Sequence, residues 1–279
     1  MGKRWLPLEA NPEVMNQFMR GLGVPAEAGF CDVYGLDDEM LAMVPQPVLA
    51  VILLYPQDRK KESVASPSST VESKKLSKNV YFTKQTIGNA CGTVGIIHAI
   101  GNALSRIKLV EGSYFDRFYK QTADMDPAQV NSPCIKLSYF WLVVNLDISH
   151  SVAVSAGDTE FCIASSFRVT LRHWDGSWLL SVVEDLLLCP WPRFSSVFGF
   201  FSHTSLYFVQ AKDGVIEHYV CFSCVDDEIF ELDGGNSQPI SHGPSSPDSL
   251  LQDAAKVIKA RIAQYPGSLN FNVMALSKQ

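Results

Sequence analysis

The stretch from Gln85 to Thr93 could carry nucleophilic catalysis by a cysteine. Polar and glycine residues up to Asn89 are followed by an apolar run from Ala90, which predicts a tight turn and then a buried helix with Cys91 in its first turn. Unpaired backbone N–H groups and the positive end of the helix dipole favour the thiolate at such a position. Gln85 can return its side-chain amide toward the sulfur as an oxyanion donor. A buried structural cysteine is the alternative, and this stretch alone favours neither.

A thiolate hydrolyses a peptide only with an imidazole nearby and a group that fixes the imidazole tautomer. Residues 218–224 and 228–232 alternate as two strands around an Asp-Asp turn, which predicts a hairpin. His218 opens the first strand and Asp233 follows the second, so the hairpin brings both to one edge. Taken alone, His218 could be an ordinary strand histidine, and Asp233 before glycine could serve only to form a turn. Together with Cys91 they predict a Cys-His-Asp triad.

The other patterned stretches predict the elements that must position this triad. Residues 48–55 are apolar on both faces, which is typical of a strand in the centre of a sheet. Asn11-Pro12-Glu13 is a helix start, with a capping side chain, a proline and an acid in the first turn. Residues 57–79 are rich in Lys, Ser and Glu without a period and predict a surface loop. Further helices are expected at residues 37–43, 91–105, 114–122 and 246–264, and further strands at 30–34 and 271–276.

Composition and charge limit the classes of protein to which this chain can belong. Its 279 residues, 47% of them hydrophobic and 19% charged, predict a globular chain with a substantial core rather than wholesale disorder. A net charge of −6 argues against a nucleic-acid binder and permits a basic protein partner. Seven cysteines without framework spacing favour a reducing compartment over secretion.

Several other patterns are expected to have no catalytic or membrane role. The longest apolar runs have about nine residues, whereas a membrane span needs ~20, and the N-terminus lacks the apolar core of a signal peptide. Cys221 and Cys224 have the spacing of half a zinc site, but no second pair accompanies them and residues three apart in a strand face opposite ways. His98 and His242 are expected to be structural. We therefore expect a soluble cytoplasmic protein, with the nucleus as a second location, and no membrane contact or metal.

The sequence resembles the ubiquitin carboxyl-terminal hydrolases, the UCH family of cysteine peptidases, and in particular their small single-domain members. The resemblance covers roughly residues 3–130 and 211–279, and motifs of this length are far more specific than a lone Cys and His. The matching stretches are Arg4-Trp5-Leu6-Pro7-Leu8-Glu9-Ala10-Asn11-Pro12-Glu13, Gln85-Thr86-Ile87 with Asn89-Ala90-Cys91-Gly92-Thr93, His218 with Phe230-Glu231-Leu232-Asp233-Gly234, and Pro239-Ile240-Ser241-His242-Gly243.

The resemblance implies an α+β, papain-like cysteine peptidase fold, with a central antiparallel sheet flanked by helices and a knotted backbone. It implies hydrolysis after the C-terminal glycine of ubiquitin, through a thioester, to release small adducts or short peptides. By position, Cys91 is the nucleophile, His218 the general base and acid, and Asp233 the residue that orients the imidazole. Gln85 is the oxyanion donor. Neither a cofactor nor a metal is implied.

Ubiquitin is the partner that the resemblance implies, with a ubiquitin-like modifier as the alternative, and we expect a monomer. Ubiquitin's tail is basic, so acidic residues of the N-terminal segment are candidates for contacting it. The candidate substrate-binding residues are Leu8, Glu9, Glu13 and Asp32. A helix-start role for Glu13 and plain surface roles for the other acids stay open.

One segment departs from the family. We expect residues 1–279 to form a single catalytic domain in which residues 130–210 are an atypical crossover-loop region. Within it, residues 161–210 hold eleven aromatic and six charged residues, which is untypical of a surface loop. We expect either an insertion with its own small core or a retained intron read in frame, and favour the second. If the enlarged loop blocks the cleft, the chain would instead be a catalytically impaired ubiquitin-binding protein.

Overall fold

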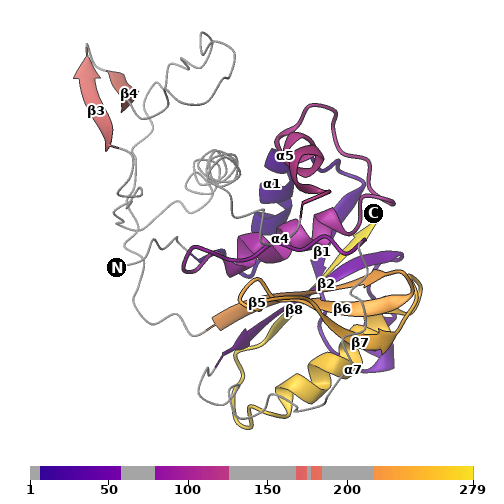
Figure 1. The fold of residues 1–279 in the computed structure, drawn as a ribbon. Helices are drawn as coiled ribbons and strands as arrows, with labels where there is room; N and C mark the ends of the chain where they lie inside the picture. Colours follow the sequence, from indigo (N-terminus) through magenta and orange to yellow (C-terminus); the bar gives the residue numbers. More distant parts are fainter. Residues whose placement is uncertain (1–6, 58–78, 126–167, 175–176, 184–216, 279) are drawn as a thin grey trace.

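The computed structural model describes residues 7–57, 79–125, 168–174, 177–183 and 217–278. Its centre is a six-stranded antiparallel sheet in the order β1-β8-β2-β5-β6-β7. Helices α1, α4 and α5 lie on one side of this sheet and α7 lies on the other (Figure 1). The strands are β1 (Ala28–Asp32), β2 (Val48–Pro56), β5 (Glu217–Val225), β6 (Glu228–Leu232), β7 (Ile240–Pro244) and β8 (Asn272–Lys278), and the helices are α1 (Pro12–Leu22), α2 (Asp38–Leu41), α4 (Cys91–Gly101), α5 (Tyr114–Thr122) and α7 (Leu250–Ile262).

This arrangement confirms the predicted antiparallel sheet flanked by helices. Strand β2 is buried almost throughout and pairs with both β5 and β8, as its two-sided apolar pattern predicts. The predicted β5–β6 hairpin is also present. The knotted path stays a prediction, because residues 126–167 and 184–216 lie outside the described part of the chain.

Most of the atypical region 130–210 likewise lies outside the described residues, as does most of the predicted surface loop at 57–79. Within residues 161–210, β3 (Arg168–Trp174) and β4 (Ser177–Val183) pair as a separate two-stranded antiparallel sheet. The interpretation of 161–210 as an insertion or a retained intron therefore stays a prediction.

Local capping chemistry sets the ends of the helices. At the start of α1 the Asn11 side chain accepts the Glu13 N–H, as predicted, and Gly23 ends the helix in the left-handed region at φ 98°. Helix α4 ends at Gly101 rather than near residue 105. Asn102 is the C-cap residue, and its side chain donates to the His98 carbonyl of the last turn and also pairs with the backbone of Tyr81.

Two strands differ from the expectation. Strand β1 covers Ala28–Asp32 instead of residues 30–34, because its pairing with β8 decides its register. Strand β7, at Ile240–Pro244, is not predicted by the sequence pattern. It is an exposed edge strand, so it carries no alternating apolar face from which it could be recognised.

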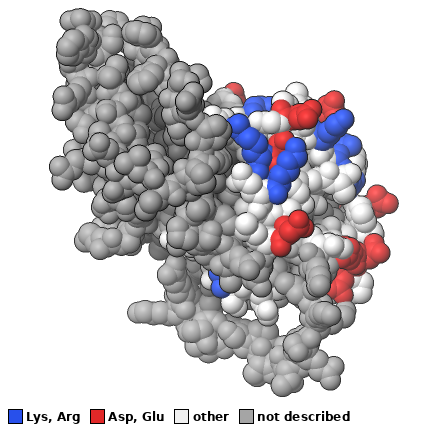
Figure 2. Space-filling view, turned by 45° about the horizontal axis from the view of Figure 1, so that its top comes forward, with Lys and Arg blue, Asp and Glu red and all other residues white. Residues whose placement is uncertain are grey.

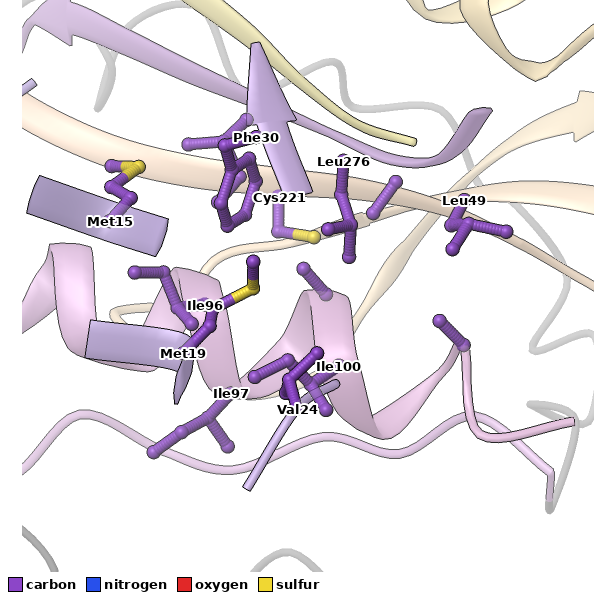
Figure 3. Close-up of a cluster of buried hydrophobic side chains, with 14 of the residues drawn as sticks. Met15, Met19, Val24, Phe30, Leu49, Ile96, Ile97, Ile100, Cys221 and Leu276 are labelled. Atoms are coloured by element: carbon purple, nitrogen blue, oxygen red, sulfur yellow. The ribbon is translucent and has the colours of Figure 1, made fainter. Parts of the chain in front are cut away.

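The core has one cluster of buried side chains on each face of the sheet. On the α4 face, side chains of α1 and α4 meet those of β1, β2, β5 and β8 (Figure 3). Helix α4 is buried at all its positions, so it is held by packing on every side. On the α7 face, the apolar side of α7 packs on β2 and β5. The sheet is therefore a rigid layer between α4 and α7.

The surface agrees with the charge argument. On the face seen in Figure 2, Lys and Arg side chains of the described residues lie among Asp and Glu side chains, which is not the basic stripe that nucleic-acid binding requires. Within the described ranges, no helix is both long and apolar enough to cross a membrane.

Candidate active site

Cys91 is the first residue of α4. Asn89, just before it, is in the left-handed region at φ 61°, which a short polar side chain tolerates, so the predicted tight turn is present. The N-cap residue is Ala90, which has no side-chain oxygen to accept the first N–H groups of the helix. The open N-terminus therefore presents its donors and its positive dipole end to the Cys91 sulfur, and the residue as a whole is only 8% exposed.

His218 and Asp233 meet at the end of the β5–β6 hairpin. His218 is the second residue of β5, and Asp233 directly follows β6. The His218 Nε2 and Asp233 Oδ1 atoms are 2.8 Å apart, and the same oxygen accepts the Gly235 N–H at 2.7 Å. Because Nε2 faces Asp233, Nδ1 is left for the hydrogen bond with Cys91. The three predicted triad residues are thus brought together in one chain of hydrogen bonds.

The charges of these groups support one another. Burial alone would raise the pKa of Cys91, but the hydrogen bond to His218, its charge and the backbone N–H groups of Tyr219 and Gly92 lower the pKa below its usual value. Burial alone would lower the pKa of His218, whereas its hydrogen bonds with Asp233 and Cys91 and their charges raise it to about 10.

The carboxylate completes the ionised state. Burial works against the charged form of Asp233, but the His218 hydrogen bond and charge and the Gly235 N–H lower its pKa. The three shifts therefore all favour the charged form of each group, a thiolate beside an imidazolium beside a carboxylate. This is the charge state that a cysteine nucleophile requires.

Gln85 lies beside the turn that carries Asp233. Its backbone N–H donates to the Gly234 carbonyl at 2.8 Å, and its side-chain Nε2 donates to the Ile87 carbonyl at 2.9 Å. That second bond uses one of the two amide hydrogens and so orients the amide. The Gln85 Oε1 atom is buried without a hydrogen-bond partner among the described residues. The amide is therefore anchored through one N–H group, and its other N–H group is the candidate oxyanion donor.

Helix α4 and its C-cap residue hold the segment that leads to Gln85. The Asn102 side chain pairs with both the N–H and the carbonyl of Tyr81, at 2.8 and 2.9 Å. One helical turn earlier, His98 Nε2 accepts the Thr83 N–H at 3.0 Å and Nδ1 lies 3.2 Å from the Leu232 carbonyl. Burial lowers the pKa of His98 to about 4, so the ring is neutral and Nδ1 carries the proton. His98 thus has the structural place expected for it.

The N-terminal candidates occupy different environments. The Leu8 side chain is buried, and its carbonyl accepts the Tyr219 hydroxyl at 3.0 Å. Glu9 and Glu13 are exposed, and Asp32 is half-buried at the end of β1. Only the three acids are therefore presented for contact with a partner. Sequence reasoning missed Tyr219, although strand alternation next to His218 would have placed its side chain on the α4 face.

The Cys221-x-x-Cys224 pair is divided between the two faces of the sheet. Cys221 is fully buried in the core cluster on the α4 face, and Cys224 packs against the cluster on the α7 face. The two thiols therefore cannot share a metal ion. Within the described ranges, no three His, Cys, Asp or Glu side chains are grouped to hold one.

Comparison with known proteins agrees with this geometry. The family model described as ubiquitin carboxyl-terminal hydrolase, family 1, matches residues 5–263. Ubiquitin carboxyl-terminal hydrolase 3 of Arabidopsis thaliana is 43% identical, with 99% of this chain and 95% of the relative covered. The isozyme L1 of Rattus norvegicus is 30% identical, with 98% and 97% covered.

Solved structures show the same fold. The Trichinella spiralis UCH37 catalytic domain, solved bound to ubiquitin vinyl methyl ester, superposes with a TM-score of 0.60 at 19% identity, covering 99% of this chain and 96% of that one. From the family match over nearly the whole chain and the identity to these relatives, this chain belongs to ubiquitin carboxyl-terminal hydrolase, family 1.

Proposed function

We propose that this chain is a thiol-dependent deubiquitinating hydrolase that cleaves after the C-terminal glycine of ubiquitin, with Cys91, His218 and Asp233 as its catalytic triad. The observation that carries the assignment is the hydrogen-bonded row of Cys91, His218 and Asp233, with Cys91 at the N-terminus of α4 and a 2.8 Å contact between His218 and Asp233. Family membership supports the substrate, and the geometry supports the residue roles.

Acylation follows from the positions of the groups. The Cys91 thiolate attacks the glycine carbonyl carbon, a C–S bond forms, and the carbonyl electrons move onto oxygen. The Gln85 amide and the Cys91 backbone N–H stabilise that oxyanion. The imidazolium of His218 then gives its proton to the leaving amine as the C–N bond breaks, which leaves a thioester and a neutral imidazole.

Deacylation reverses these roles. Neutral His218 takes a proton from water, the hydroxide attacks the thioester carbonyl, and the Cys91 thiolate leaves as the carboxylic acid of ubiquitin forms and releases its proton to the solvent. Asp233 keeps the imidazole in the orientation that both steps need. The reaction ends with the same thiolate and imidazolium with which it began.

Acidic residues near the N-terminus are the candidate contacts for the basic tail of ubiquitin. Glu9 and Glu13 are exposed, and Asp32 lies half-buried at the end of β1. A ubiquitin-like modifier is the alternative partner. The cysteine content supports the reducing cytoplasm as the site of the reaction.

Ubiquitin bearing a C-terminal vinyl methyl ester tests the proposal. Mass spectrometry should find one covalent ubiquitin adduct on the wild-type chain and none on Cys91→Ala. The matched control is Cys31→Ala, which removes a half-buried thiol whose pKa is raised by burial and should leave the adduct intact. An adduct that persists in Cys91→Ala would contradict the proposal. A folded wild-type chain that binds ubiquitin without forming an adduct would be the ubiquitin-binding protein instead.

A further inference from the structure

Tyr219 touches the nucleophile with its backbone and the N-terminal segment with its side chain. Its backbone N–H hydrogen-bonds to the Cys91 sulfur. Its hydroxyl, at the other end of a side chain that is almost fully buried, donates to the Leu8 carbonyl at 3.0 Å. The first bond joins β5 to Cys91, and the second ties the N-terminal segment to β5 at Leu8.

The close approach at Gly92 shows how tightly the N-terminal segment covers the helix. A Cβ atom at position 92 would lie 2.8 Å from Leu8 Cβ and 3.1 Å from Tyr219 Cε2. Only glycine leaves room for both neighbours there. Leu8 and Tyr219 therefore rest directly on the first turn of α4, at the residue that follows Cys91.

The chemistry of the Tyr219 hydroxyl suits a permanent attachment. Burial raises its pKa, and the nearby charges of Cys91 and Glu9 raise it further, so the hydroxyl stays protonated and remains a donor. The Leu8 carbonyl that accepts it belongs to a buried residue, and a buried carbonyl without a donor is costly. Glu9 directly follows Leu8 in the chain, so this exposed candidate contact lies next to the attachment.

We propose that the Tyr219 hydroxyl is a positioning group that fastens the N-terminal segment over the first turn of α4, and thereby limits access to Cys91 and holds Glu9 in place for the substrate. The limited access concerns only the Cys91 thiol. The placement of Glu9 rests on the proposed function, because it concerns ubiquitin. The hydroxyl itself contacts neither the imidazole nor the reacting atoms, so it acts through the segment that it holds.

Tyr219→Phe removes the hydroxyl and keeps the ring. We expect iodoacetamide to alkylate Cys91 about three- to ten-fold faster, as the loss of one neutral hydrogen bond would allow the segment to lift. Mass spectrometry of the Cys91 peptide separates this rate from those of the other cysteines. With a fluorogenic C-terminal amide of ubiquitin, KM should rise several-fold while kcat stays within about two-fold, since His218, Asp233 and Gln85 keep their partners.

Tyr81→Phe is the matched control. Tyr81 is also buried, its hydroxyl is 2.8 Å from Thr122 Oγ1, and its ring lies on Gly101 at the opposite end of α4. This variant should lose similar stability and change neither the alkylation rate nor KM. Equal acceleration in both variants would attribute the effect to general loosening and overturn the inference, as would a wild-type alkylation rate in Tyr219→Phe.

A second variant covers the case in which Tyr219→Phe does not fold. Leu8→Ala loosens the same segment from its other side and should also speed alkylation of Cys91, whereas an unchanged rate would contradict the inference. The proposed function and the role of Tyr219 are tested independently. A wild-type chain that does not cleave the ubiquitin amide would contradict the proposed function, while faster alkylation in Tyr219→Phe would still support the control of access to Cys91.

Discussion

At the scale of single residues, the thiolate depends on charges that outweigh its burial. Cys91 is almost completely buried, which by itself would favour the neutral thiol. The imidazolium of His218 and the N–H groups at the start of α4 reverse that preference. His218 in turn stays protonated because Asp233 accepts its Nε2 proton at 2.8 Å. The three ionisations are therefore coupled, and a change at one should appear in the titration of the others.

The pH dependence of kcat/KM should reveal this coupling. In the wild type, activity should rise as the thiolate forms below the usual thiol pKa, and fall as the pH passes the His218 pKa of about 10. Asp233→Asn removes the carboxylate that raises the pKa of His218, so the basic limb should move to lower pH. Activity at neutral pH should fall about 100-fold or more.

Asp248→Asn, at an exposed aspartate, is the control for this profile and should leave both limbs in place. If the basic limb of Asp233→Asn stays where it is in the wild type, Asp233 does not stabilise the imidazolium. Its role in the triad would then have to be given up.

At the scale of elements, the turn after β6 and the segment before α4 must stay in contact for Gln85 to serve as an oxyanion donor. The Gln85 N–H bonds to the Gly234 carbonyl at 2.8 Å. A Cβ atom at position 234 would lie 2.7 Å from Val94 Cγ1 and 3.1 Å from the Gln85 backbone nitrogen. A side chain at 234 must therefore displace Gln85 or α4.

Gly234→Ala should consequently lower kcat without changing the reactivity of the Cys91 thiol. We expect kcat to fall about 10- to 100-fold through loss of oxyanion stabilisation, because the Gln85 amide is pushed from its position. Alkylation of Cys91 by iodoacetamide should change by less than about two-fold, since the bond between His218 and Cys91 remains. Steady-state kinetics measure kcat, and peptide mass spectrometry measures the alkylation rate of Cys91.

Gly95→Ala is the control on the same helix as Cys91. A Cβ atom at Gly95 would meet Ile52 and Tyr219 at 3.9 Å, an ordinary contact distance. Its kcat should stay unchanged, and the helix should gain up to about 1 kcal/mol from the better propensity of alanine. A wild-type kcat in Gly234→Ala would refute the placement of Gln85 as the oxyanion donor.

At the scale of the whole molecule, an ionic network on the α7 face supports the catalytic edge from behind. The Glu231 carboxylate of β6 is buried, accepts two bonds from Arg261 Nη2 on α7 at 2.8 and 2.9 Å, and lies 2.8 Å from His242 Nε2 on β7. The Arg261 guanidinium lies 5.0 Å from the Tyr55 ring centre, and the Tyr55 ring makes a T-shaped contact with the His218 ring. Strands β6 and β7, helix α7 and the imidazole of His218 are thus linked through this network.

Glu231→Gln should destabilise the fold because it leaves the mostly buried Arg261 without its countercharge. We expect a loss of about 3 kcal/mol in the free energy of unfolding at neutral pH, measured by urea denaturation. Burial raises the pKa of Glu231, but His242 and Arg261 outweigh it and lower the pKa. The carboxylate therefore stabilises the fold above its unfolded pKa and loses this effect as the pH falls through the lower folded pKa.

The difference in stability between wild type and Glu231→Gln should accordingly be largest at neutral pH and shrink in acid. Lys120→Gln, which breaks the exposed pair with Asp116 on α5, should change stability little at either pH. A difference that stays constant down to acid pH would mean that the charge of Glu231 does not stabilise the fold.

Local sequence predicts a large part of this architecture because short-range interactions decide it. The Asn11 cap and Pro12 define the start of α1, the change from polar to apolar residues defines the start of α4, and the Asp-Asp turn defines the β5–β6 hairpin. Each signal lies within a few residues. Strand β7 has no such signal and is missed, since pairing with β6 alone makes it a strand.

From the residues alone, the candidate nucleophile, the helix that carries it and the hairpin that carries its partners could be predicted. The folded chain was needed to show that Nε2 rather than Nδ1 of His218 meets Asp233, that Gln85 bonds beside Gly234, and that the Tyr219 hydroxyl bonds to Leu8 across 211 residues. The physical reason is that these contacts join segments brought together by the strand order β8-β2-β5-β6 and by the packing of α4 on that sheet. Neighbours of that kind are selected by burial and pairing across the whole fold, which no local pattern encodes.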